Sequence, residues 1–335
     1  MPARLAPKSV QLVWAGGENY WNGWYAMDMM VAGGPLRAGL WYPYPWYSRS
    51  AGGRLAAFNV ADPAAPMFLS ETNLMATNSW SYSTAFTTGG LVYLSHQNSE
   101  FVEDILPPNP GGVTPTDPTK VPDPIQTQGH WIQKYYLDVI DYADAALPTV
   151  RKPVGLPGQL TGLSHEGAVV YARSYHVAAN GTRDYSVEWI DACAYDGVSA
   201  ALVDSLALSK EWPRPALVQG NYLFLGSADS TTNQLNRLET WTLSEQGRFT
   251  PLSAFSQKSA ANVFAVFGNL LAVQNNDSSY ELLDMTNPLK LVLVGQSTAG
   301  SCWYGSLTYA DGLLDRGLWI PLGDYGVTKL ELTPR

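Results

Sequence analysis

Short hydrophobic strands recur along the chain and are separated by polar turns. The clearest version is an apolar strand that in most copies leads into a turn of Asp, Asn or Pro. It begins at Leu55, Leu137, Val187, Leu238 and Tyr280. A spacing of roughly 50 residues between such units is typical of a repeat architecture, and for four-stranded units it predicts a β-propeller. The pattern therefore indicates an all-β protein.

A second type of apolar strand precedes these copies and sets the number of units. Several copies follow Gly-Gly, Glu-Gly, Gly-Asn or Asp-Gly, which suit the positive φ of hairpin turns. These second strands begin at Leu40, Leu91, Val169, Tyr222, Leu270 and Leu318. They predict six blades, each a four-stranded antiparallel sheet.

The two ends of the chain carry strands that could complete one another. The last blade supplies three strands and ends near residues 327–332, whereas residues 10–15 form an apolar strand ahead of the first blade. Pairing these ends would remove two exposed sheet edges. We therefore expect a ring closed by the N-terminal strand, which completes the last blade, and a single propeller domain over residues 1–335.

One segment does not follow the pattern. Residues from about 99 to 129 are rich in Pro, Asp and Thr and fall between the second and third strands of the second blade. A connection of this length is usually either functional or a tolerated surface extension. The sequence predicts a Pro-rich loop insertion and leaves its role open.

Composition and charge exclude several classes of partner. Hydrophobic residues make up 46% of the chain and charged residues 15%, with 12 Trp and 19 Tyr, which suits a large aromatic-rich sheet core. The formal net charge of −9 and the lack of a basic run argue against nucleic acid. Apolar stretches are strand-sized, so we expect no membrane span.

The N-terminal residues lack the continuous apolar core of a secretory signal, so either the protein stays inside the cell or the chain is a mature or excised fragment. Lysine is nevertheless scarce, while Trp, Tyr, Ser, Thr and Asn are plentiful. This composition favours an extracellular, cell-surface or periplasmic protein, whether as a mature fragment or as part of a larger assembly.

Candidate binding residues gather on one face of the predicted propeller. Loops between second and third strands share this loop-rich face with the connections between blades. Trp and Tyr there suit stacking on a glycan or anchoring a protein partner, because they bring a large contact area at small entropic cost. The alternative is that they fill the core between blades. The aromatic candidates are Tyr20, Trp21, Trp46, Trp80, Trp212, Trp303 and Tyr304.

Three predicted second strands end near an acidic residue: Asp229, Asp277 and Asp324. Converging carboxylates could bind Ca²⁺ or sugar hydroxyls. The alternative is that they cap their own turns. Because no metal-ligand spacing is present, we expect no cofactor. Ca²⁺ would be bound only in the enzymatic alternative given below.

Catalytic motifs are missing from the sequence. There is no HExxH spacing, GxSxG elbow, P-loop or dinucleotide fingerprint. His96, His130 and His176 could approach one another on the loop-rich face, whereas His165 is expected to face the other way. Cys193 and Cys302 are expected far apart, as free thiols.

The hairpins that begin at Phe58 and Leu283 resemble the LVIVD repeat, a hydrophobic strand, Asp, a short polar turn with Pro and a strand ending in Gly. The segment from Leu137 to Gly155 is similar but looser. That resemblance implies a bacterial surface or exported propeller. It implies no catalytic residues, because the function of that family is mostly unassigned.

Together these features favour a non-enzymatic propeller that contacts a protein or glycan partner through its aromatic and acidic loop-rich face, or that forms a structural subunit of an exported assembly. The alternative is a polysaccharide-active or lactonase-like enzyme with Asp229, Asp277 and Asp324 around a central metal ion. A third interpretation is a spacer domain within a longer protein.

Overall fold

The computed structural model describes residues 10–16, 28–30, 53–59, 65, 67–74, 79–80, 85–103, 129–177, 183–208, 216–227, 237–256, 261–267, 269–275, 280–297, 308–311, 316–321 and 327–331. Within these ranges the strands form six antiparallel sheets, numbered here 1 to 6 in chain order, with one short 3₁₀ turn, η2 (His165–Gly167). The prediction of an all-β protein is confirmed. These ranges contain no helix long and apolar enough to cross a bilayer.

Sheets 1 and 2 come from the first half of the chain. Sheet 1 has the order β2 (Asp28–Met30), β1 (Val10–Gly16), β3 (Gly53–Asn59), β4 (Met67–Leu74). In sheet 2, the long strands β7 (Leu91–Glu103) and β8 (Gly129–Asp141) pair with each other. Short strands flank them: β5 (Ser79–Trp80) and β6 (Ala85–Thr88) on β7, β9 (Thr149–Val150) and β10 (Val154–Leu156) on β8.

Sheets 3 to 6 keep their strands in sequence order. Sheet 3 contains β11 (Gln159–Ser164), β12 (Val169–Val177), β13 (Arg183–Tyr195) and β14 (Ala200–Leu208). Sheet 4 contains β15 (Ala216–Gln219), β16 (Tyr222–Ser227), β17 (Arg237–Leu243) and β18 (Phe249–Ser256). Sheet 5 contains β19 (Ala261–Phe267), β20 (Leu270–Asn275), β21 (Tyr280–Asp284) and β22 (Val292–Ser297). Sheet 6 contains β23 (Thr308–Asp311), β24 (Arg316–Pro321) and β25 (Val327–Glu331).

The predicted second strands from Leu91 onward are confirmed as β7, β12, β16, β20 and β24, whereas the one at Leu40 lies outside the described residues. Their entry turns use glycine as expected: Gly90, Gly167 and Gly220 have φ of 83°, 88° and 56°. Such values are accessible to glycine without a steric penalty. The turn residues therefore place the strand starts.

The Asp and Asn turns after the third strands are confirmed as well. The Asp141 carboxylate accepts the Ala143 N–H (2.9 Å), and Asp284 accepts the Thr286 N–H (2.8 Å). A side chain that bonds its own backbone two residues on fixes a tight turn. These turns lead the chain from the third strand into the fourth.

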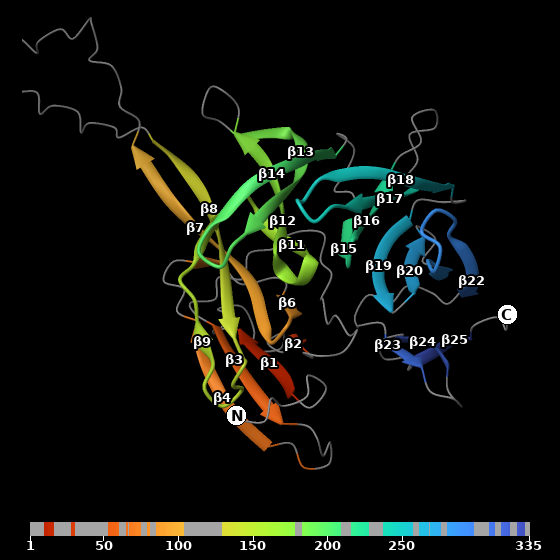
Figure 1. Ribbon diagram of the computed structural model, residues 1–335, viewed down its shortest axis with the longest axis horizontal. Helices are drawn as coiled ribbons and strands as arrows, with labels where there is room; N and C mark the ends of the chain where they lie inside the picture. The colour runs from red at the N-terminus through yellow and green to blue at the C-terminus, as the bar shows by residue number, and fades with distance from the viewer. Residues whose placement is uncertain are drawn as a thin grey trace, which may run out of the picture.

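The core lies between successive sheets, which follow one another around the molecule in Figure 1. Four clusters of buried side chains each join two neighbours: sheets 1 and 2, 2 and 3, 3 and 4, and 4 and 5. Between sheets 2 and 3, for example, Leu137 packs with Leu160, Val170 and Cys193. Because full burial of a large aliphatic side chain is worth ~1.5–3 kcal/mol, each sheet depends on its neighbour.

A hydrogen bond between neighbouring sheets recurs. The Ser70 hydroxyl of β4 donates to the carbonyl oxygen of Ala145 in sheet 2 (2.6 Å). The Ser253 hydroxyl of β18 donates to the carbonyl oxygen of Pro288 in sheet 5 (2.7 Å). In both cases the acceptor lies in the turn after the third strand of the next sheet. The outer strand of one sheet is thus tied to that turn.

Asp204 of β14 holds the corresponding place in sheet 3, where its carboxylate accepts the Phe249 N–H of sheet 4 (3.0 Å). All three side chains stand opposite a third-strand residue that immediately precedes a shift in pairing register. For Ser70, Asp204 and Ser253, these residues are Ala57, Ala192 and Thr240. We call this place the latch position.

The predicted closure of a ring by the N-terminal strand is wrong. β1 pairs with β2 through residues 12–14 and with β3 along its whole length, so both of its edges are occupied within sheet 1. β25 pairs with β24 in sheet 6 and not with β1. β1 also fills the place beside β3 that the sequence assigned to a strand near Leu40.

The paired strands β7 and β8 are 13 residues long each and run beyond their neighbours as a two-stranded ribbon, which leaves the molecule at the upper left of Figure 1. Residues 99–103, the first of the predicted insertion, belong to β7, and residue 129 begins β8. Residues 104–128 lie outside the described ranges.

Candidate functional site

All but one of the residues proposed for binding lie outside the described ranges. Trp80 is the exception: it forms part of β5 and pairs with Gln97 of β7. The others are Tyr20, Trp21, Trp46, Trp212, Trp303, Tyr304, Asp229, Asp277 and Asp324. The candidate site must therefore be built from other side chains.

An acidic residue occupies the same place in the third strand of four sheets. In each of sheets 2 to 5, a backbone hydrogen bond ends the ladder between the second and third strands. Its N–H donors are Tyr142, Tyr195, Leu243 and Met285, respectively. Four residues before each donor stand Asp138, Asp191, Glu239 and Glu281. Asp138 and Asp191 are buried, whereas the two glutamates are partly exposed.

The repeat pattern in the sequence aligns the third strand of sheet 3 differently. It places Glu188 in the position of Asp138, because Val187 and Leu137 begin similar hydrophobic runs. The pairing register instead places Asp191 opposite Ala172, as Asp138 is opposite Leu94. The alignment of this strand therefore shifts by three residues, from Glu188 to Asp191. The shift puts a carboxylate on the buried face that packs against sheet 2.

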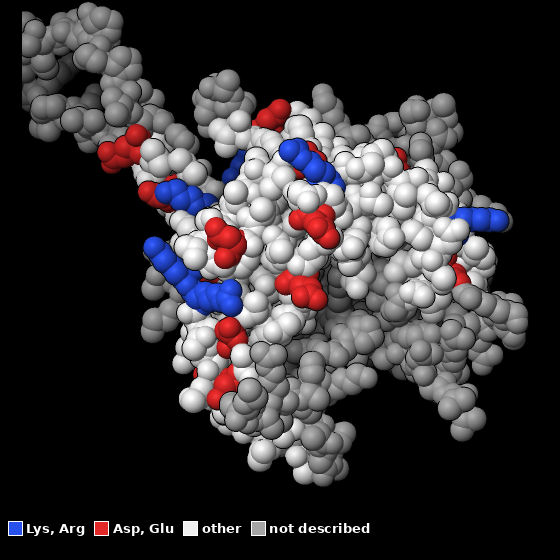
Figure 2. Space-filling model, in the orientation of Figure 1, with Lys and Arg blue, Asp and Glu red and all other residues white. Residues whose placement is uncertain are grey.

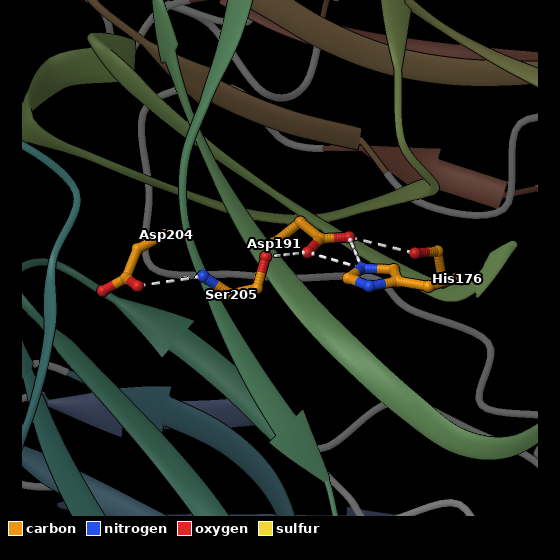
Figure 3. Close-up of polar contacts among 5 residues, drawn as sticks. His176, Asp191, Asp204 and Ser205 are labelled. Atoms are coloured by element: carbon orange, nitrogen blue, oxygen red, sulfur yellow. Dashed lines mark hydrogen bonds and ion pairs between the residues drawn. The ribbon is translucent and has the colours of Figure 1, made fainter. Parts of the chain in front are cut away.

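Figure 3 shows how three strands converge on the Asp191 carboxylate. The Ser205 hydroxyl of β14 donates to it at 2.6 Å, and the Ser174 hydroxyl of β12 donates at 3.0 Å. His176 Nε2 lies 2.9 and 3.0 Å from its two oxygens. Asp191 is 0% exposed. A buried carboxylate is tolerated when it is paired and hydrogen-bonded in this way.

The His176 ring is held from a second side by Trp189. The two rings stack with centroids 4.5 Å apart and planes inclined by 4°. Trp189 precedes Asp191 by two residues, so both side chains project from the same face of β13. With 36% of its side chain exposed, His176 joins the buried carboxylate to the surface.

Sheet 2 contains a matching arrangement. His96 Nδ1 bonds the Asp138 carboxylate, and the His96 ring stacks on Tyr136 with centroids 5.0 Å apart. Tyr136 precedes Asp138 by two residues, as Trp189 precedes Asp191. A sequence pattern could have revealed both arrangements. It consists of an aromatic residue two positions before an Asp in a third strand, together with a His late in the second strand.

The two histidines belong to different layers and do not meet. His96 shares a strand face with Val92 and Leu94, which pack against sheet 1, whereas His176 lies on the face of sheet 3 toward sheet 2. The predicted approach of His96 and His176 is therefore wrong, and the side chain of His130 lies outside the described part of the structure. His165 lies in η2, bonded to the Leu243 carbonyl oxygen. Among the described residues, no group of three or more His, Cys, Asp or Glu side chains is placed to hold a metal ion.

The hydrogen bonds around Asp191 favour a structural role over a reactive one. The Asp191 oxygens are engaged by three donors, which leaves little capacity for a metal or a substrate. The nearby Cys193 is a buried free thiol, as expected, and burial raises its pKa to about 12, whereas Cys302 lies outside the described residues. A thiol with so high a pKa stays protonated at neutral pH and is a poor nucleophile.

Large apolar side chains are exposed where the second strands of sheets 2 and 3 turn into the third. Trp131 is 68% and Tyr185 71% exposed, and Phe101 and Val177 lie near them in these hairpins. The two hairpins are joined by Arg183, which donates to the side-chain oxygen (2.9 Å) and main-chain oxygen (3.2 Å) of Gln133. We call these hairpin ends the rim.

Charges are sparse on the face in Figure 2, and both signs are interspersed near the base of the ribbon. On the ribbon itself, Lys134 is bonded to Glu100. Among the residues that Figure 2 colours, no single-sign field is visible that would select a strongly charged partner.

Comparison with known proteins adds no identification. No family model matches the chain, and no curated protein matches it. The candidate function therefore depends on geometry and chemistry.

Proposed function

We propose that the chain is a non-enzymatic six-bladed β-propeller, outside the cytoplasm, that binds a glycan or protein partner through its rim. Sheets 1 to 6 would be the six blades. The LVIVD-like turns and the composition support an exported or cell-surface setting, in which the ring could also serve as a subunit of an assembly.

The propeller arrangement is supported by corresponding contacts. Sheets 1, 3 and 4 each bond the next sheet through the latch position, and buried clusters join sheets 1 to 5 in succession. Equal contacts between successive units imply a similar rotation at each step, which generates a ring or a superhelix. Because β1 is committed to sheet 1, the ring would close by packing of sheet 6 on sheet 1, without strand exchange.

The observation that carries the binding proposal is the placement of Trp131 and Tyr185. Both are more than half exposed, and both lie at hairpin ends on the same side of sheets 2 and 3. Exposed aromatic residues on connections held by a rigid scaffold are typical binding anchors. Catalysis has no comparable support, because the His–Asp pairs are built into the packing between sheets.

The test compares the rim with the opposite side of the same sheets. The rim variant combines Trp131→Ser and Tyr185→Ser. The control combines Leu147→Ser and Val198→Ser, which change similarly exposed residues in the turns between third and fourth strands. Each purified protein is applied to an oligosaccharide array and to an array of extracellular and bacterial surface proteins.

We expect the wild-type protein and the control to bind on at least one array and the rim variant to lose that binding. Equal binding by the rim variant would contradict the proposed face. The lack of any wild-type binding on both arrays would contradict the binding function.

A further inference from the structure

One face of the β7–β8 ribbon forms a short strip of aromatic and planar polar side chains. Phe101 stands directly opposite Trp131, and their rings meet edge to face with centroids 5.4 Å apart. Because side chains alternate along a strand, Gln133 and Tyr135 follow Trp131 on the same face. The strip from 131 to 135 is about 13 Å long.

Phe101 is held in place by the lack of a side chain at Gly129. A Cβ atom built on Gly129 would lie 2.4 Å from Cζ and 2.8 Å from Cε1 of the Phe101 ring, and 2.5 Å from the main-chain oxygen of Val102. Real Cβ contacts are not that short, so any other residue would displace both the ring and the facing β7 backbone. The ring therefore rests on the β8 backbone beside Trp131.

Hydrogen-bonding groups stand at both ends of the aromatic pair. Toward the body of the protein, the Arg183 guanidinium bonds Gln133 and lies 5.7 Å from the centroid of the Tyr135 ring. Its bonds to Gln133 use two of the five N–H donors that an arginine carries. Toward the ribbon end, Glu103 is exposed and shares the face of Phe101.

We propose that this strip binds a neutral oligosaccharide. Trp131 and Phe101 would stack on the apolar C–H faces of the sugar rings, and Gln133, Arg183 and Glu103 would bond the flanking hydroxyls. The proposal rests on the proposed function, because it names the partner of the same rim. A pyranose has an apolar C–H face with hydroxyl groups at its edges, which matches large apolar rings flanked by hydrogen-bonding side chains.

The size and charge of the strip favour a sugar over a protein. Full burial of an aromatic side chain covers about 150–250 Å², and Phe101 and Trp131 are 41% and 68% exposed, so the two rings offer less than roughly 300–500 Å². A stable protein interface buries about 800 Å² on each partner. Arg183 and Glu103 stand at opposite ends and balance in charge, so neither an acidic nor a basic ligand is favoured.

The test uses the full chain and an array of neutral oligosaccharides that includes cello-, chito- and malto-oligomers, followed by calorimetric titration with the best ligand. Trp131→Ala is expected to weaken binding about tenfold or more. Phe101→Ala is expected to weaken it several-fold by removing the second stacking ring. Lys134→Gln, on the other face of the same strand, is the matched control and is expected to bind normally. Thermal unfolding of each variant verifies that the fold is intact.

Two results would overturn the sugar proposal while leaving the proposed function standing: rim-dependent binding on the protein array with none on the sugar array, or sugar binding that Tyr185→Ser abolishes and Trp131→Ala does not change. If neither array is bound, both proposals fall.

Discussion

The Asp191 carboxylate joins three strands of sheet 3. It accepts hydrogen bonds from Ser174 on β12 and Ser205 on β14, and it pairs with His176. Hydrogen bonds to a charged group contribute more than neutral ones, and a buried donor that loses its partner carries a desolvation cost. The side chain therefore stabilises the observed pairing register of these three strands.

Asp191→Asn is expected to lower the free energy of unfolding by about 2 kcal/mol, because the amide nitrogen faces donors instead of accepting from them. Urea denaturation measures the change. The matched control is Asp144→Asn in the turn after β8. The Asp144 side-chain oxygen accepts the N–H of the residue two positions later, and in the equivalent turn of sheet 5 Asn287 accepts the same hydrogen bond. The control should change stability by less than about 0.5 kcal/mol. Equal effects at both sites would contradict this role for Asp191.

At the scale of elements, the latch position links neighbouring sheets by a side chain in the outer strand. Ser70 and Ser253 bond carbonyl oxygens of turns in the next sheet, although they lie in different parts of the chain. The serine hydroxyl satisfies a carbonyl that the turn itself leaves without a strand partner. The contact thus fixes how one sheet lies on the next.

Ser70→Ala and Ser253→Ala are each expected to destabilise the protein by about 1 kcal/mol, the net value of one hydrogen bond. The double variant should lose about 2 kcal/mol, since distant sites act independently. Ser186→Ala, at an exposed position in β13, is the control. Denaturation curves test this, and an unchanged midpoint in both single variants would refute the latch.

For the whole molecule, stability resides in the interfaces between sheets. Buried clusters connect sheets 1 to 5 in succession, and β22 of sheet 5 also contacts β25 of sheet 6. An open array of such units has end units with only one neighbour, and these can unfold first. A closed ring has no end units.

The proposed ring is therefore expected to unfold in a single calorimetric transition, with equal calorimetric and van't Hoff enthalpies. Removing residues 308–335, which include sheet 6, should lower the midpoint of that one transition. An open array would instead show separate transitions, with the remaining sheets retaining their original midpoint after truncation.

The sequence predicted the individual strands well because their signals are local. Gly90, Gly167 and Gly220 mark the entry to second strands, and Asp141 and Asp284 mark the exit from third strands. The all-β class follows from these features.

The candidate site could not be predicted in the same way. Glu188 and Asp191 both fit an acidic position in a hydrophobic strand, and only the register against β12 selects Asp191. The ribbon strip needs Arg183 from sheet 3 to lie beside Gln133 of sheet 2, 50 residues earlier in the chain. Neither relation leaves a periodic signal.

The sequence by itself determined where the second strands that follow glycine turns begin, how several third strands turn and that the chain forms antiparallel sheets, because these depend on backbone preferences and on residues a few positions apart. Tertiary structure decided that β1 joins β3 in place of the last sheet, that His96 and His176 serve separate carboxylates and that Phe101 and Trp131 form one exposed strip. These outcomes depend on packing and hydrogen bonding between distant segments, whose free energies no local pattern encodes.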